Sequence, residues 1–308
     1  MPAGAVLMAR GLGDSMIKLA VSDLDDTLIA VGRPHATRHA LDAIRAMRRM
    51  GLHFAPASGR VPWDLGWMFD EEASAYGTAV LINGQVVYID GELVLERQLD
   101  RDELARIGEA LRAVPGAALM IDDYGDRFAV GVTAEEMRQF RGAFDRIGSV
   151  RAEVPHKKVV KANVHVAGDS AHLAEVRDLL TEGFGEAFDF VYPNPRATLV
   201  DILPKGWGKD RGVDYLRRQL GLEREEVVAF GDAENDLSVL RSVPNSTCVS
   251  NAVPQVMAAS RWHIGASKDD AVADALMDIA AAAATGGMPA YMRGASFNPD
   301  AVYQPVGE

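Results

Sequence analysis

The sequence predicts an α/β protein, with an open parallel sheet into which a second, α+β unit is inserted. Strand-like apolar runs alternate with helix-like segments from residue 17 to the AVLI run at 79–82, and this alternation returns at about residue 199. Between these two stretches, hairpin-like strands and scattered helices replace the regular alternation. The outer stretches therefore form one unit, and the middle of the chain forms another.

Each element follows from a local pattern. In the first stretch we expect a strand at 17–23, an amphipathic helix at 36–50 that Gly51 ends, a strand in LHFAPAS, a short helix in VPWDLGWMF and a strand in AVLI. Asn83 and Gly84 predict a tight turn, followed by strands in QVVYID and GELVLERQL. The inserted unit continues with helices near 101–114, in AEEMRQFRGAFDRIG and at 170–183, and with strands in GAALMID, RFAVGV and KVVKANVHVAG.

The returning stretch has strands in LVDIL, VVAFG, TCVS and WHI, and helices at 209–220, in NDLSVLRS and in DDAVADALMDIAAAA. The expected boundaries are an N-terminal extension at 1–15, a first domain at 16–84 and 199–284, an inserted domain at 85–198 and a C-terminal tail at 285–308.

Composition limits the class of function. The net charge is -12, which argues against a nucleic-acid binder because phosphate-backbone affinity comes from clustered Lys and Arg. The N-terminal AGAVLMAR is too short to span a bilayer, so we expect no membrane contact. Cys248 is the only cysteine, which favours a reducing, cytoplasmic location. The oligomeric state stays open.

Polar residues gather where four predicted strands end, which is where sites form in open parallel sheets. These residues are Asp23, Asp25 and Thr27 in DLDDT, Ser58, Gly59 and Arg60 in SGR, Lys209 in the helix after LVDIL, and Asp232, Asn235 and Asp236 in GDAEND.

This combination fits magnesium-assisted phosphoryl transfer. A carboxylate nucleophile approaches an anionic phosphoryl group only if a divalent cation offsets the charge of both. Asp23 and Asp232 offer the hard oxygen ligands that Mg²⁺ prefers. Ser58 and the backbone N–H groups after it are suited to hold the phosphate oxygens, and Lys209 adds a positive charge.

Lys209 independently indicates an anionic site. A lysine in the first helical turn opposes the helix dipole, so its position suggests an anionic neighbour. The alternative is that Lys209 is solvated and that Lys205 is equally eligible.

The order DxDxT, strand-end Ser, Lys and GDxxND resembles the haloacid dehalogenase superfamily, and in particular Cof-type phosphatases with a C2B cap, over residues 17–284. The resemblance implies a Rossmann-like core with an inserted cap, and it assigns roles to individual residues. Asp23 matches the nucleophile that forms an aspartyl-phosphate, and Asp25 matches the acid/base, whose backbone carbonyl also binds magnesium. The other matches are Ser58, Gly59, Lys209 and Asn235 for phosphate binding, Asp232 for the metal, and Thr27 and Asp236 for support.

Asp26, Arg60 and a set of residues in the inserted unit each have two alternative roles. Asp26 stands where glycine is usual in this family, and it either alters the loop or points to solvent. Arg60 reaches an anionic substrate or, as the second alternative, pairs with an acid on a neighbouring strand. Lys157, Lys158, Lys161, Asn163 and His165 contact a substrate or, as we favour, form a solvated or packed sheet face; His53 is also read as a sheet residue.

The expected function is a Mg²⁺-dependent phosphatase that acts on a small phosphorylated metabolite such as a sugar phosphate. A sugar-phosphate phosphomutase would use the same aspartates. A non-catalytic protein that binds a phosphorylated metabolite on the same scaffold is the third alternative.

Overall fold

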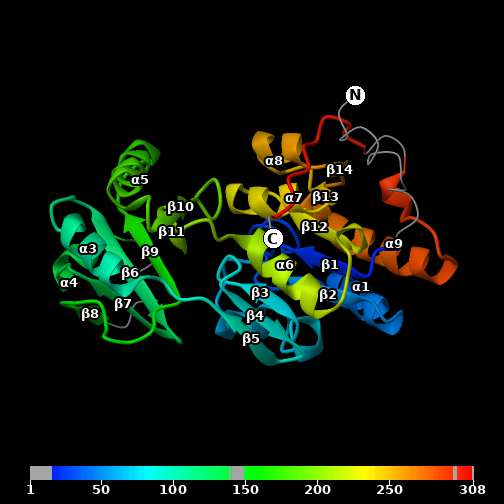
Figure 1. Ribbon diagram of the computed structural model, residues 1–308, viewed down its shortest axis with the longest axis horizontal. Helices are drawn as coiled ribbons and strands as arrows, with labels where there is room; N and C mark the ends of the chain where they lie inside the picture. Colours follow the sequence, from blue (N-terminus) through cyan, green and yellow to red (C-terminus); the bar gives the residue numbers. More distant parts are fainter. Residues whose placement is uncertain (1–15, 139, 141–148, 294–296, 307–308) are drawn as a thin grey trace.

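The computed structural model describes residues 16–138, 140, 149–293 and 297–306, and its two units lie side by side (Figure 1). The predicted extension at 1–15 lies outside the described residues. So does most of the helix expected in AEEMRQFRGAFDRIG, of which α4 (Ala134–Met137) is described.

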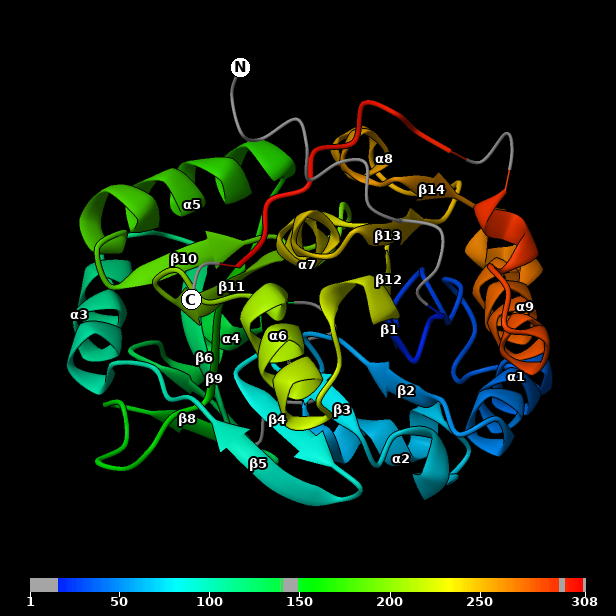
Figure 2. The ribbon, with the colours of Figure 1, turned by 45° about the vertical axis from the view of Figure 1, so that its right-hand side comes forward.

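The first unit, which we call the core unit, contains a five-stranded parallel sheet with strand order β14–β13–β12–β1–β2. Its strands are β1 (Leu19–Ser22), β2 (His53–Pro56), β12 (Val227–Gly231), β13 (Asn245–Cys248) and β14 (Trp262–His263). Its helices are α1 (Arg38–Arg49), α2 (Leu65–Met68), α6 (Lys209–Gln219), α7 (Leu237–Ser242), α8 (Pro254–Ala259) and α9 (Ala271–Thr285). In Figure 2, α1 and α9 lie together on one side of β1, β2 and β12, and α6 and α7 lie on the other.

The first helix shows how local sequence sets these elements. Thr37 caps α1, because its hydroxyl accepts the N–H of Ala40 at 3.1 Å. Leu41, Ile44 and Met47 recur at helical spacing and are buried. The expected helix and its end are confirmed.

Strands β3 (Ala79–Leu81), β4 (Val86–Ile89) and β5 (Glu92–Glu96) form an antiparallel sheet that belongs to the core unit. The prediction that the inserted unit begins at residue 85 is therefore wrong, because Val86 and Val87 are buried in the same apolar cluster as β1 and β2. The chain leaves the core unit only after β5. Gly84 turns this hairpin with φ +93, and a Cβ there would lie 2.2 Å from the carbonyl oxygen of Gly208.

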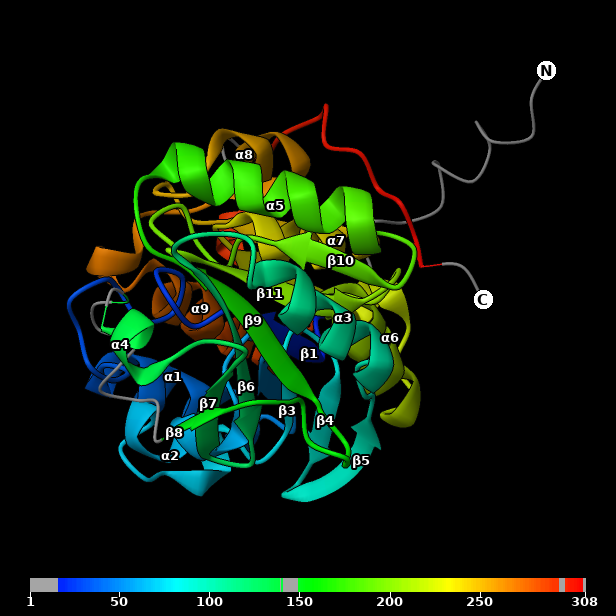
Figure 3. The ribbon, with the colours of Figure 1, turned by 90° about the vertical axis from the view of Figure 1, so that its left-hand side faces the viewer.

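The second unit, which we call the cap, has a six-stranded sheet with order β10–β11–β9–β6–β7–β8. Its strands are β6 (Ala117–Asp123), β7 (Asp126–Val130), β8 (Ser149–Arg151), β9 (Lys161–Val166), β10 (Phe188–Val191) and β11 (Leu199–Pro204). Helices α3 (Arg101–Leu111) and α5 (Ser170–Phe184) pack on the apolar face of this sheet, and Figure 3 shows both helices beside β9.

The strand predicted in LVDIL belongs to the cap and not to the core. It is β11, which pairs antiparallel with β9 and β10, and its Val200 and Ile202 join the apolar cluster of the cap. An apolar run predicts a strand but not the sheet that receives it. The chain therefore returns to the core unit after Pro204.

The expected C-terminal tail packs against the core unit in part. Met292 is buried there, and the rings of Phe297 and Trp262 lie 5.1 Å apart. Within the described part of the chain, no helix is both long and apolar enough to cross a membrane. The α/β core with an inserted α+β unit is confirmed.

Candidate active site

Lys209 is the first residue of α6 and the centre of a buried charge cluster. It has no exposed surface, and its Nζ donates to Asp23 Oδ1 and to Asp236 Oδ1, each at 2.6 Å. Burial alone would lower the pKa of Lys209, but the two carboxylates raise it above its ordinary value. The anionic neighbours expected from the helix dipole are therefore present. Lys205 instead pairs with Asp189 at the surface.

Asp232 follows β12 and is held by two neighbours. The hydroxyl of Thr27 donates to Asp232 Oδ1 at 2.6 Å. Asp236 Oδ2 accepts the backbone N–H groups of Asp232 and Ala233, each at 3.0 Å. Asp236 thus holds both Lys209 and the loop at 232–236, and Thr27 links the loop after β1 to the loop after β12.

Three buried carboxylates offer a site for a cation. Asp23, Asp232 and Asp236 each present an oxygen within 4.8 Å of the others. Both oxygens of Asp236 already accept hydrogen bonds, whereas Asp23 and Asp232 each keep one oxygen that accepts none from a described residue. Asp23 and Asp232 are therefore the better ligands.

Electrostatics supports the same assignment. Burial raises the pKa of Asp23 to about 7 and that of Asp232 to about 8, and the neighbouring carboxylates add to both shifts. Lys209 opposes both shifts but does not cancel them, so a further cation would help to keep these two carboxylates ionised together. The donor set of oxygens alone fits Mg²⁺.

Asp25 lies beside Asp23 but has a different partner. The guanidinium of Arg60 holds both its oxygens, with Nε to Oδ2 at 2.8 Å and Nη2 to Oδ1 at 2.6 Å. This bond to Asp25 raises the pKa of Arg60 above its ordinary value. Of the two alternatives for Arg60, the structure shows the ion pair with a neighbouring acid, so Arg60 orients Asp25.

Ser58 and Gly59 follow β2 at the same edge of the sheet. Ser58 is buried, and its backbone N–H donates to the carbonyl of Val80. A Cβ on Gly59 would lie 3.2 Å from the amide of Asn83 and 3.3 Å from the carboxylate of Asp201, so this turn is tightly enclosed.

A buried chain of polar groups, which the sequence did not reveal, joins the cap to this site. Lys161 donates to Asp201 Oδ1 at 2.6 Å, and Asn83 Nδ2 donates to Asp201 Oδ2 at 2.9 Å. Asn83 Oδ1 in turn accepts from Asn235 Nδ2 at 3.1 Å. The sequence predicts Asn83 only as a turn residue and Asp201 only as part of a strand. No sequence signal pairs positions so far apart.

The carboxylate of Asp26 contacts other residues and does not simply point to solvent. Its φ of +62 explains why glycine suits this position, and its carboxylate accepts from Ser267 at 2.9 Å and pairs with Arg196 of the cap at 3.1 Å. Asn251 donates to the carbonyl of Asp26 at 2.8 Å. These contacts brace the loop that carries Asp23 and Asp25.

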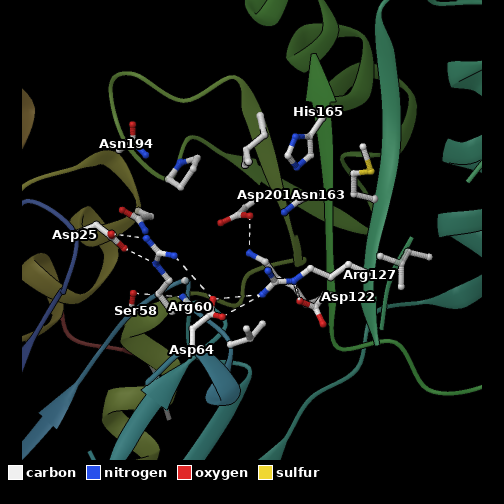
Figure 4. Close-up of a pocket in the computed structure, with 18 of the residues that line it drawn as sticks. Asp25, Ser58, Arg60, Asp64, Asp122, Arg127, Asn163, His165, Asn194 and Asp201 are labelled. Atoms are coloured by element: carbon white, nitrogen blue, oxygen red, sulfur yellow. Dashed lines mark hydrogen bonds and ion pairs between the residues drawn. The ribbon is translucent and has the colours of Figure 1, made fainter. Parts of the chain in front are cut away.

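A cavity of about 330 Å³ lies between the two units. Asp23, Asp25, Ser58, Gly59, Arg60 and Asn235 line it from the core. From the cap, Lys161, Asn163 and His165 line it along alternate positions of β9, and Figure 4 shows the last two of these side chains. These three side chains line a cavity and not an open sheet face, and His165 is partly exposed on its strand as expected. Lys157 and Lys158 are exposed and pair with Asp123 and Glu96.

Comparison with known proteins places the chain in a family. Residues 20–276 match the family of haloacid dehalogenase-like hydrolases. The chain is 25% identical over 273 residues to a 5-amino-6-(5-phospho-D-ribitylamino)uracil phosphatase of Escherichia coli, which covers 84% of this chain and 95% of that protein. It is 25% identical over 248 residues to an HMP-PP phosphatase of Citrobacter koseri, which covers 79% and 88%.

The fold is also that of a solved subclass IIB sugar phosphatase of this superfamily, with a TM-score of 0.69, 19% identity, and coverage of 84% of this chain and 97% of that one. The predicted enzyme family and its type of cap are confirmed. The chain belongs to the haloacid dehalogenase-like hydrolase family.

Proposed function

We propose that this protein is a Mg²⁺-dependent phosphatase that hydrolyses a small phosphorylated metabolite through an aspartyl-phosphate. One observation carries the proposal. Asp23 is buried between Lys209 and the Asp232 loop, on a cavity that also holds Asp25 and that the cap covers. The phosphatase names of the relatives support the same class of phosphoric monoester hydrolase.

The proposed reaction has two successive displacement steps at phosphorus, and Asp23 and Asp25 take part in both. In the first, an oxygen of Asp23 bonds to phosphorus while the bond from phosphorus to the leaving oxygen breaks, and Asp25 donates a proton to that oxygen. In the second, Asp25 takes a proton from water, whose oxygen bonds to phosphorus as the bond to Asp23 breaks. Arg60 holds Asp25 in position.

Asp23 and Asp232 would hold the magnesium ion, with the backbone carbonyl of Asp25 as a further ligand, and Asp236 would support them. Bound there, Mg²⁺ offsets the negative charge shared by the carboxylates and the phosphoryl group. Lys209, Ser58, Gly59 and Asn235 would hold the phosphoryl oxygens. The cap would exclude bulk water from the cavity. A sugar phosphate as substrate and a cytoplasmic location remain part of the proposal.

The test is phosphate release from a panel of phosphorylated metabolites, with Mg²⁺ or with chelator. We expect release only with Mg²⁺, and a loss of at least about 10³-fold in Asp23→Asn. Asp102→Asn is the matched control, because Asp102 is exposed on α3. No release from any substrate would contradict the proposal. Labelled phosphate left on Asp23 by a bisphosphorylated sugar would then favour a phosphomutase.

A further inference from the structure

The cap wall of the cavity carries polar groups that nothing in the described structure satisfies. Asn163 Oδ1 is buried and has no hydrogen-bond partner among the described residues. His165, two positions along β9, also forms no hydrogen bond within that part of the chain. Leaving a buried polar group unpaired costs about 1–3 kcal/mol, so such groups commonly mark the place of a ligand or water.

These two groups are uncharged. An asparagine amide offers both donors and an acceptor, and burial lowers the pKa of His165 to about 4, so its ring is neutral at pH 7 and also offers one donor and one acceptor. Figure 4 shows both side chains across the cavity from Asp25 and Ser58. Asn163 and His165 therefore lie on the side of the cavity opposite the residues proposed to hold the phosphoryl group.

The charged groups that line the cavity are already paired. Lys161 is bound to Asp201, and Arg60 is bound to Asp25. Arg127 donates its Nε to Asp122 at 2.5 Å, and it also reaches Asp64 at 3.3 Å. Within the described lining, each of the three cationic side chains is thus held by a carboxylate, and carboxylates outnumber cations.

We infer that Asn163 and His165 bind the leaving group of the substrate, and that this group is an uncharged polyhydroxy or amide-bearing moiety. A second phosphate or a carboxylate on the leaving group would meet excess negative charge and no unpaired cation of the described lining. The inference rests on the proposed function, and it goes beyond it by excluding bisphosphates and phosphorylated carboxylic acids as preferred substrates. It also disfavours the phosphomutase alternative, which requires a bisphosphate.

The experiment compares four probes: glucose 6-phosphate, fructose 1,6-bisphosphate, 3-phosphoglycerate and 4-nitrophenyl phosphate. We expect kcat/KM for glucose 6-phosphate to exceed the values for the bisphosphate and the phosphoglycerate by at least about tenfold, as expected for a missing or unfavourable polar contact. A preference for either of these two doubly anionic probes would overturn the inference.

Two apolar variants of similar size test the named residues. Asn163→Leu and His165→Phe should each lower kcat/KM for glucose 6-phosphate by about 10-fold to 100-fold, which corresponds to the loss of a buried hydrogen bond to substrate. Turnover of 4-nitrophenyl phosphate, which has no hydroxyl groups on its ring, should change by less than about threefold. His156→Phe, at an exposed cap position, is the matched control.

Equal losses with both substrates, or no loss with either, would contradict the roles of Asn163 and His165. Calorimetric binding of the same probes to Asp23→Asn protein tests the inference apart from turnover. If wild type hydrolyses no probe, the proposed function fails. If Asn163→Leu and His165→Phe leave the binding of glucose 6-phosphate to Asp23→Asn protein unchanged, the inference fails.

Discussion

The two walls of the cavity are built on opposite principles. On the core wall, charged side chains hold one another: Lys209 with Asp23 and Asp236, and Arg60 with Asp25. On the cap wall, Asn163 and His165 face the cavity without partners among the described residues. The charged groups of the core wall are therefore organised before any substrate arrives. On the cap wall, Lys161 and Arg127 are likewise paired, whereas Asn163 and His165 would gain hydrogen bonds only from a ligand.

The largest expected effect is on the core wall. Lys209→Met would leave two buried carboxylates without their cation, and we expect a loss of about 3–5 kcal/mol in unfolding free energy at pH 7 in the presence of chelator. Lys205→Met is the matched control, because its ion pair with Asp189 is exposed and should contribute no more than about 1 kcal/mol. Urea denaturation measures both. Equal losses in the two variants would show that the buried cluster does not stabilise the fold.

The second prediction concerns the polar chain that joins the two walls. Asn83→Asp would place a buried carboxylate against Asp201, and we expect it to lose about 2–3 kcal/mol. Adding Asp201→Asn should recover at least half of this loss. The asparagine introduced at position 201 can donate to the new carboxylate and still accept from Lys161. Urea denaturation of the two single variants and the double variant measures the coupling. Additive losses would contradict a direct contact between these side chains.

The smallest effect is expected on the cap wall and depends on pH. The pKa of His165 is about 4 in the folded protein, below its ordinary value of 6.5, because burial outweighs Asp201, and Lys161 adds to the lowering. The unfolded chain therefore takes up the proton first. The contribution of His165 to stability is full above pH 6.5 and falls as the pH drops toward 4.

Relative to His165→Phe, the wild-type protein should lose no more than about 2 kcal/mol between pH 7 and pH 5. The measurement is the difference in unfolding free energy between wild type and variant at each pH, which cancels the other titrating groups. His156→Phe, at an exposed cap position, is the control. A difference that stays constant with pH would mean that His165 titrates normally in the folded protein.

The sequence by itself determined the parallel core, its strand ends and the charged residues that gather there. DLDDT, SGR and GDAEND each follow a strand of the parallel sheet, whose topology brings their positions together, whereas Lys209 begins a helix that follows the cap strand β11. Local periodicity and turn chemistry are enough for such a prediction, because each signal lies within a few residues.

Only the tertiary structure decided which sheet each strand joins and which distant residues contact one another. It assigned β11 and the β4–β5 hairpin to their units, because an apolar strand carries no mark of the sheet that it will join. It also paired Arg60 with Asp25 and Asn83 with Asp201, and it turned Asn163 and His165 toward the cavity. These relations join residues that are distant in sequence or depend on which face of a strand is covered, and both are set by packing between the units.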